Sequence, residues 1–373
     1  MNTKSKAVVG IVAVLLLIAG WWILGVQGTP EGKGPIKIGA SLPLTGEAAS
    51  YGEMTKPGID LAVREINDSG GIEGRPIEIV YEDDKCSSEG GSSAFNKLVA
   101  VDKVAAVIGP VCSVAASAAL PIAQKSGVPT LIIASAPGLT KIGDYIFRVY
   151  PSDSLQGKFA AEYVFNTLGK HAVAILYVKN DWGEGLKDTF NRRFTELGGT
   201  VTLSEGIVQG RTDVRTELTK IKASSPQLIY IPLQPDSGVA VAKQAKALGI
   251  NAPLFGGDFF DTKEFTTPSE TAGILFTIGK FNNPEEFKAR IKSETGADSA
   301  ILTPLGYDAL KVFAYVIGEA GIDPQAMQRE LSDLSYTDGE SQPLISFDKD
   351  GDLEAAQFEV RVVKSGKSEP FEK

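Results

Sequence analysis

Apolar and polar residues follow one another along most of this chain with two different spacings. Residues 36–41 are mostly apolar, which is typical of a buried strand. Ile59, Ala62 and Ile66 then recur at the spacing of one helix face, and Gly70-Gly71 provides a stop signal. The pattern therefore predicts a strand followed by a helix at the start of the folded body.

The same alternation continues in two series. The first predicts further strands at 77–81, 104–108 and 128–134 and helices at 94–101 and 113–125, the latter capped by Ser113. After a break at residues 151–153, the second predicts strands at 172–178, 201–208, 228–233 and 253–256, with helices between them. Strands such as 172–176 are apolar on both faces, which indicates parallel strands covered by helices on either side. We expect an α/β protein with two doubly wound, Rossmann-like domains.

The C-terminal part has a different rhythm. Helices are predicted at 285–294, 306–320 and 324–334, followed by two strands at 345–347 and 358–363. We expect these elements to complete the two domains, because they are too few for a third. Domain 1 then comprises residues 36–150 and 280–357, and domain 2 comprises 151–279 and 358–373. The chain would cross between them near 150, 280 and 358, as a three-segment hinge.

The N-terminus differs from the body. Lys4 and Lys6 precede an uncharged run at residues 7–26, which is long enough to span a bilayer. Residues 1–28 are therefore expected to be a membrane anchor or a cleaved signal peptide, and 29–35 a Gly- and Pro-rich linker. Both alternatives place the body outside the cytoplasm, with the positive flank inside.

Composition narrows the possible functions. Without the two lysines of the leader, the body has 35 basic against 46 acidic residues, which argues against a nucleic-acid partner. The single histidine, His171, begins an apolar strand and is expected to be structural. The acidic stretch at 348–352 lacks the further ligands of a calcium-binding loop and is expected to be a turn. We expect no metal and no cofactor, and no motif gives an enzyme positive support, although distant carboxylates could still meet in the fold.

Cys86 and Cys112 are the two cysteines. In an exported protein such a pair indicates a disulfide, and two buried free thiols are the alternative.

Candidate ligand contacts lie in the loops after the predicted strands, where open α/β sheets bind ligands. These loops contain hydroxyl groups, aromatic rings and acids. Hydroxyls and helix N-termini suit a carboxylate, and an acid suits an ammonium group.

These loops and the motifs around them resemble those of the type I periplasmic binding proteins of branched-chain amino-acid ABC transporters. The resemblance covers residues 36 to about 363 and rests on motifs in order: Ile38-Gly39-Ala40, Pro43-Leu44-Thr45-Gly46, Tyr51-Gly52, Ile66-Asn67, Gly70-Gly71-Ile72, Asp83-Asp84, Ile108-Gly109, Ser135-Ala136-Pro137, Phe147-Arg148 and Trp182-Gly183-Glu184-Gly185.

The resemblance implies roles for individual residues. Cys86 and Cys112 match the disulfide of the family. The remaining positions match ligand contacts: Ser113 and Ser135 for an α-carboxylate, Asp258 for an ammonium group, and Tyr51 and Trp182 for the aromatic lining. Leu233 and Ile133 depart from the family pattern, so the side-chain pocket could differ.

The resemblance also implies a function. The chain is expected to be an extracytoplasmic solute-binding protein that captures an amino acid and delivers it to an ABC permease. The alternatives are a ligand-sensing ectodomain for a signalling partner and a binder of amides, urea or aromatic acids.

Overall fold

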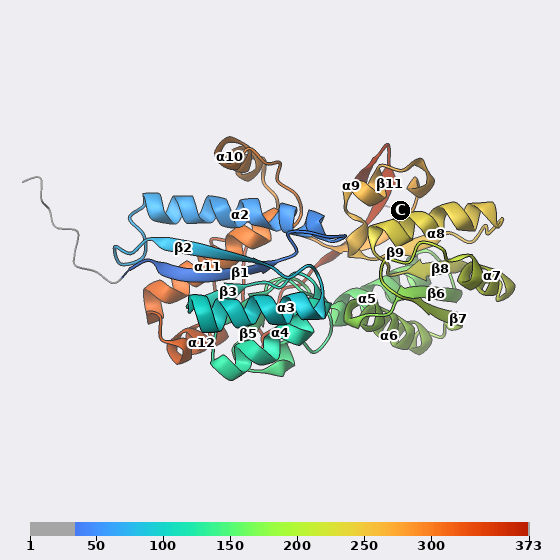
Figure 1. The fold of residues 1–373 in the computed structure, drawn as a ribbon. Coiled ribbons are helices and arrows are strands. Elements are labelled where there is room, and N and C mark those ends of the chain that lie inside the picture. The colour runs from blue at the N-terminus through green and yellow to red at the C-terminus, as the bar shows by residue number, and fades with distance from the viewer. Residues whose placement is uncertain (1–33, 372–373) are drawn as a thin grey trace, which may run out of the picture.

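The computed structural model describes residues 34–371, and the predicted anchor or signal segment lies outside them. In that described part, no helix is both long and apolar enough to cross a membrane. The chain forms two lobes, each built on one sheet, and they lie end to end in an elongated molecule (Figure 1).

The first lobe contains a parallel five-stranded sheet with the order β2-β1-β3-β4-β5. Its strands are β1 (Ile36–Leu42), β2 (Ile77–Asp83), β3 (Ala106–Ile108), β4 (Thr130–Ile132) and β5 (Ile146–Arg148). Its α-helices are α2 (Ala49–Asp68), α3 (Ser88–Asn96), α4 (Ser113–Ser126), α10 (Glu285–Thr295), α11 (Thr303–Ala320) and α12 (Pro324–Ser332). Alternate residues of β1 explain the layers: Ile38 packs into the core with α2 and α11, whereas Gly39 faces Leu98 on the opposite side.

The second lobe contains a seven-stranded sheet with the order β12-β11-β10-β9-β8-β6-β7. Its strands are β6 (Ala172–Val178), β7 (Thr200–Ile207), β8 (Leu228–Ile231), β9 (Leu254–Gly256), β10 (Leu275–Gly279), β11 (Phe358–Lys364) and β12 (Lys367–Pro370). Its α-helices are α5 (Asp153–Glu162), α6 (Asp181–Glu196), α7 (Arg215–Ala223), α8 (Pro235–Ala247) and α9 (Lys263–Thr266). The strands from β7 to β10 are parallel, and β11 and β12 are added antiparallel at one edge.

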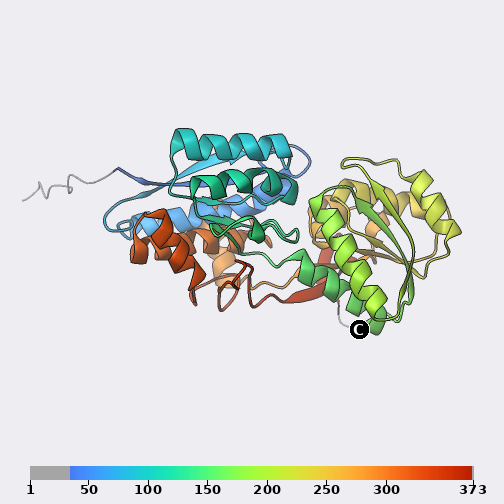
Figure 2. The same ribbon diagram turned by 90° about the horizontal axis from the view of Figure 1, so that it is seen from below.

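The chain passes between the lobes in three places. These are the segment between β5 and α5, the segment between β10 and α10, and the segment before β11. Figure 2 shows these connections running side by side between the two lobes. The C-terminal helices α10 to α12 therefore return to the first lobe, and the last two strands return to the second.

One prediction about local structure is wrong, the strand at 345–347. Residues 345–347 form only isolated antiparallel bridges, Tyr336 with Ile345 and Phe347 with Leu353. Pro343 lacks a backbone N–H and the acidic turn begins at Asp348, so too few residues remain for a ladder. The second C-terminal strand is instead β12, which pairs with β11 through a tight turn.

The disulfide prediction is confirmed. Cys86 follows β2 and Cys112 precedes α4, and their sulfur atoms are bonded. The bridge fixes the loop before α3 to the start of α4, close to the cleft-facing edge of the first sheet.

Candidate functional site

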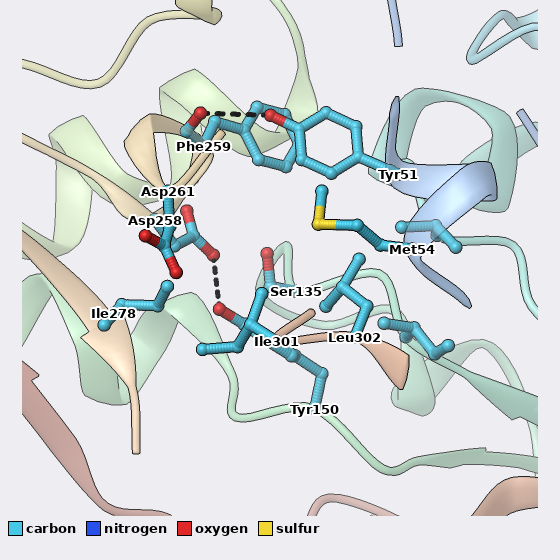
Figure 3. A pocket seen from close by; sticks show the side chains of 12 residues that line it. Tyr51, Met54, Ser135, Tyr150, Asp258, Phe259, Asp261, Ile278, Ile301 and Leu302 are labelled. Carbon is cyan, nitrogen blue, oxygen red and sulfur yellow. Dashed lines mark hydrogen bonds between the residues drawn. The ribbon is translucent and has the colours of Figure 1, made fainter. Parts of the chain in front are cut away.

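A small cavity lies where the carboxyl ends of the strands of both lobes meet (Figure 3). The volume that the centre of a water molecule can reach inside it is about 30 Å³, and this accommodates about two water molecules. Its polar lining comes from both lobes: Tyr51, Ser135, Tyr150, Asp258 and Asp261. The cavity therefore brings acids, hydroxyls and aromatic rings together in one place.

Asp258 is the buried acid of the cavity. It begins the 3-10 turn Asp258–Phe260 directly after β9, and 8% of its surface is exposed. The Tyr150 hydroxyl donates to its Oδ2 at 2.9 Å, and its Oδ1 has no hydrogen-bond partner among residues 34–371. Burial raises the pKa of Asp258 to about 6, and the bond from Tyr150 partly opposes this. At neutral pH the group is thus an anion, and the side chains of Gln156 and Trp182 also interact with it favourably.

Ser113 and Ser135 lie close to each other, but only Ser135 lines the cavity. Ser113 is the first residue of α4 rather than its cap, because Cys112 occupies the N-cap position. The Ser113 hydroxyl instead accepts a hydrogen bond from the Ala136 backbone N–H at 3.1 Å, which ties α4 to the loop after β4. That bond uses an acceptor lone pair and leaves the hydroxyl proton of Ser113 available.

The two predicted aromatic residues are separated by a third that sequence reasoning missed. Phe259 stacks on Tyr51 with ring centroids 4.5 Å apart and on Trp182 with centroids 4.3 Å apart. Tyr51 also donates its hydroxyl proton to the Phe259 carbonyl at 3.1 Å. Trp182 is buried behind Phe259 and does not line the cavity. Because Tyr51 belongs to α2 and Phe259 to the second lobe, this stack joins the lobes across the cleft.

The apolar wall of the cavity comes mainly from the first lobe: Met54, Val111, Ile133, Ile301 and Leu302. Phe259 and Ile278 complete it from the second lobe. Of the two positions where the chain departs from the family pattern, Ile133 lines this wall, whereas Leu233 is fully buried in the core of the second lobe. Branched aliphatic groups on several sides favour an aliphatic partner.

Sequence reasoning also missed Tyr150 and Asp153. Tyr150 lies in the segment between β5 and α5, and Asp153 is the first residue of α5, a stretch that the pattern marks only as a break. A signal was available, because a segment that crosses between two domains has to pass the cleft between them. The apolar residues at 301–302 carry no such signal, since they precede α11 in an irregular stretch.

The acidic stretch forms a turn closed by its own carboxylate. Asp348 Oδ1 accepts from the backbone N–H groups of Asp350 and Asp352, and the flanking Phe347 and Leu353 form an antiparallel bridge. Asp352 then forms an ion pair with the buried Arg148 at 2.8 Å. Within residues 34–371, no group of three or more His, Cys, Asp or Glu side chains is arranged to hold a metal ion.

A partly open cavity between two doubly wound lobes, which are joined by three connecting segments, defines a binding protein that holds a small molecule in its interdomain cleft. The comparisons with known proteins agree with this class. The chain belongs to the periplasmic binding protein family, whose model matches residues 35–367.

Individual relatives span nearly the same length. A leucine-, isoleucine-, valine-, threonine- and alanine-binding protein of Pseudomonas aeruginosa is 30% identical over 354 residues, which is 92% of this chain and 94% of that protein. The crystal structure of the leucine-binding protein LivK from Thermotoga maritima has a TM-score of 0.83 and 28% identity, covering 90% of this chain and 98% of that one. LivJ from Streptococcus pneumoniae in complex with isoleucine has a TM-score of 0.80 and 30% identity, with the same coverage.

Proposed function

We propose that this protein captures a branched-chain amino acid between its two lobes and delivers it to the membrane permease of an ABC importer. The observation that carries the proposal is the composition of the cavity. A wall of aliphatic side chains lies beside Asp258, whose Oδ1 has no hydrogen-bond partner in the part of the chain that the structure describes. An amino acid with an aliphatic side chain matches both features.

The charges of such a ligand explain the polar groups. A buried zwitterion needs a partner for each charge, because an unpaired buried charge costs several kcal/mol. Asp258 offers a free carboxylate oxygen to the ammonium group. Ser135, in the loop after β4, and Ser113, the first residue of α4, offer hydroxyls to the carboxylate. Ser113 also lies beside the backbone N–H groups that begin α4. Each lobe thus holds one end of the ligand, so binding favours closure.

The relatives support the same ligand class. Those compared above bind leucine, isoleucine or valine by name, or hold isoleucine in the crystal, and their chains are covered almost completely. We infer the ligand class of this chain from these relatives, which are 28–30% identical to it. We expect the ligand to be released chemically unchanged, since the proposed function includes no chemical step.

The domain limits and the leader complete the proposal. We assign residues 36–150 with 280–357 to one ligand-binding domain and residues 151–279 with 358–373 to the other, with the three crossing segments as the hinge. The body works outside the cytoplasm, held there by residues 1–28 as an uncleaved anchor. Intact-mass measurement of natively expressed protein tests the anchor, and a mature chain that begins near Thr29 would contradict it.

Isothermal titration calorimetry tests the ligand. We expect binding of leucine, isoleucine or valine, weaker binding of the matching amide and carboxylic acid, which each lack one charge, and no binding of benzoate. Asp258→Asn should lose on the order of 2–5 kcal/mol, the range for removing one partner of a buried charge pair. Asp261→Asn is the matched control, because Asp261 lines the same cavity but pairs with Ser368 and Arg361. Equal losses in both variants, or binding of amides alone, would contradict the proposal.

A further inference from the structure

The two serines of the site direct their hydroxyls differently. Ser113 accepts from the Ala136 N–H and keeps its proton available. Ser135 donates its proton to Asp153 Oδ2 at 3.1 Å. A hydroxyl has one proton, so Ser135 then presents only lone pairs to the cavity that it lines. Lone pairs repel a carboxylate, so this arrangement conflicts with the role proposed for Ser135.

Asp153 is the group that decides the direction of this hydrogen bond. It is the first residue of α5 and is fully buried, and its backbone N–H donates to the Ser135 carbonyl at 2.8 Å. Its Oδ1 has no hydrogen-bond partner within residues 34–371. A buried, ionised carboxylate with one oxygen unsatisfied is costly, and protonation removes most of that cost.

The surrounding charges divide into two groups. Arg148 and the N-terminus of α5 favour the ionised form of Asp153, but Arg148 already forms an ion pair with Asp352 at 2.8 Å. Burial and the nearby Asp258 carboxylate favour the neutral form.

The remaining titratable groups that face Asp153 are the phenols of Tyr150 and Tyr230, which are themselves kept neutral by burial and by these acids. On balance the pKa of Asp153 is raised well above its ordinary value, with burial as the largest cause.

We propose that Asp153 is a positioning residue whose neutral carboxyl donates its proton to Ser135 Oγ and thereby turns the Ser135 hydroxyl toward the carboxylate of the ligand. The proposal rests on the function proposed above, since it needs a ligand carboxylate at Ser135. It converts Ser135 from a hydrogen-bond acceptor into a donor without any movement of heavy atoms. Whether the site prefers a ligand carboxylate to a ligand amide N–H then depends on the proton of the Asp153 carboxyl.

The ligand preserves this state. In the empty site the negative charge near Asp153 is Asp258. In the bound site the ligand ammonium neutralises Asp258, but the ligand carboxylate at Ser135 brings a new negative charge even closer to Asp153. Asp153 therefore faces one negative charge in both states and keeps its proton.

The test is the pH dependence of affinity for leucine, measured by calorimetry from pH 6.5 to 9.5 for wild type and Asp153→Asn. The asparagine amide can only donate to Ser135, so the variant imitates the neutral carboxyl at every pH. Wild type and Asp153→Asn should bind leucine with similar affinity at every pH at which Asp153 is neutral. Wherever Asp153 ionises, wild-type affinity should fall by up to about tenfold relative to the variant, the lower value for a hydrogen bond to a charged group. Both proteins share the titration of the ligand itself, so the ratio of their affinities isolates Asp153.

Ser135→Ala provides the control. In that background Asp153→Asn should leave the pH profile unchanged, because the hydroxyl through which Asp153 acts is gone. Wild-type affinity about tenfold below that of Asp153→Asn at every pH in this range would overturn the proposal, because Asp153 would then be ionised throughout. Loss of leucine binding in Asp153→Asn at every pH would overturn it too. If wild type itself binds no amino acid, the proposed function fails and not this inference alone.

A measurement on wild type keeps the proposal testable should Asp153→Asn fail to fold. In protein labelled with ¹³C at the aspartate carboxyls and saturated with leucine, NMR at pH 7.5 should show one aspartate still protonated. The other buried aspartates with raised pKa values, Asp84, Asp258 and Asp308, have values of about 6 and should be ionised there. A spectrum in which every aspartate is ionised would refute the assignment.

Discussion

Gly185 should decide whether the two lobes can close. It lies in the first turns of α6, on the second lobe, and faces the loop after β4 on the first lobe. A Cβ atom added at this position would lie 2.4 Å from Pro137 Cδ, and its three nearest atoms all belong to Pro137. A proline ring has little freedom to move aside, so Gly185→Ala forces the lobes apart rather than rearranging one of them.

The magnitude follows from the clash. Overpacking of a tight contact costs about 1–3 kcal/mol, which weakens the apparent affinity by roughly 5- to 150-fold if it falls on the closed state alone. Within the open protein the same change replaces a helical glycine by alanine, which favours the helix by about 1 kcal/mol. We therefore expect weaker ligand binding together with unchanged or higher thermal stability of the ligand-free protein.

Calorimetry with leucine gives the affinity, and small-angle scattering with and without leucine gives the closure. Gly318→Ala is the matched control, because it also lies within a helix and a Cβ there meets nothing within 4 Å. It should leave both affinity and closure unchanged. Gly185→Ala protein that binds leucine as tightly as wild type and contracts to the same extent would refute the reasoning.

Three further predictions concern charge and covalent structure. Ligand affinity should fall as the pH drops through about 6, up to tenfold per unit, because protonation of Asp258 competes with the ligand ammonium; calorimetry between pH 4.5 and 7.5 checks this. Burial raises the pKa values of Asp84, Asp258 and Asp308 to about 6, above their unfolded values, so each contributes stability that is present in acid and lost as the pH rises through about 6. Each contribution is about 3 kcal/mol at most, and urea unfolding of ligand-free Asp308→Asn should show a smaller loss of stability between pH 5 and 8 than wild type. The disulfide closes a loop between residues 26 apart in sequence, so Cys86→Ala with Cys112→Ala should lower the free energy of unfolding by about 3 kcal/mol; an unchanged urea midpoint would contradict this.

The regular part of the fold could be predicted because burial leaves a clear pattern. A strand such as β6 is covered on both faces, so its apolar run is continuous and marks a parallel sheet. The C-terminal strands were harder to predict. The strand β12 consists of exposed and half-buried residues, Lys367–Pro370, and it is held by pairing to β11 rather than by its own apolar content. Such an edge strand has almost no hydrophobic signal.

The site was predictable in part from where regular elements end, and in part from the family resemblance, which pointed to Tyr51. Ser135 and Asp258 follow strands whose ends meet at the cleft, so their loops could be chosen before the fold was known. Phe259 could not be distinguished from a core aromatic, because its importance comes from stacking between two residues that are distant in sequence, Tyr51 and Trp182. The apolar wall has the same difficulty, since Met54 and Leu302 resemble any buried side chains.

The residues that reasoning from sequence missed share one location, and it links binding to closure. Tyr150 lies in the first crossing segment, which has to bend when the lobes move, and Asp153 begins α5 at the end of that segment. Tyr150 holds Asp258 of the second lobe through its hydroxyl, and Asp153 holds Ser135 of the first lobe through its carboxyl and backbone. The two groups proposed to bind opposite ends of the ligand are thus each attached to the same short stretch of hinge. A ligand that fixes both groups also fixes the bend of that stretch, so recognition and closure need no separate coupling element.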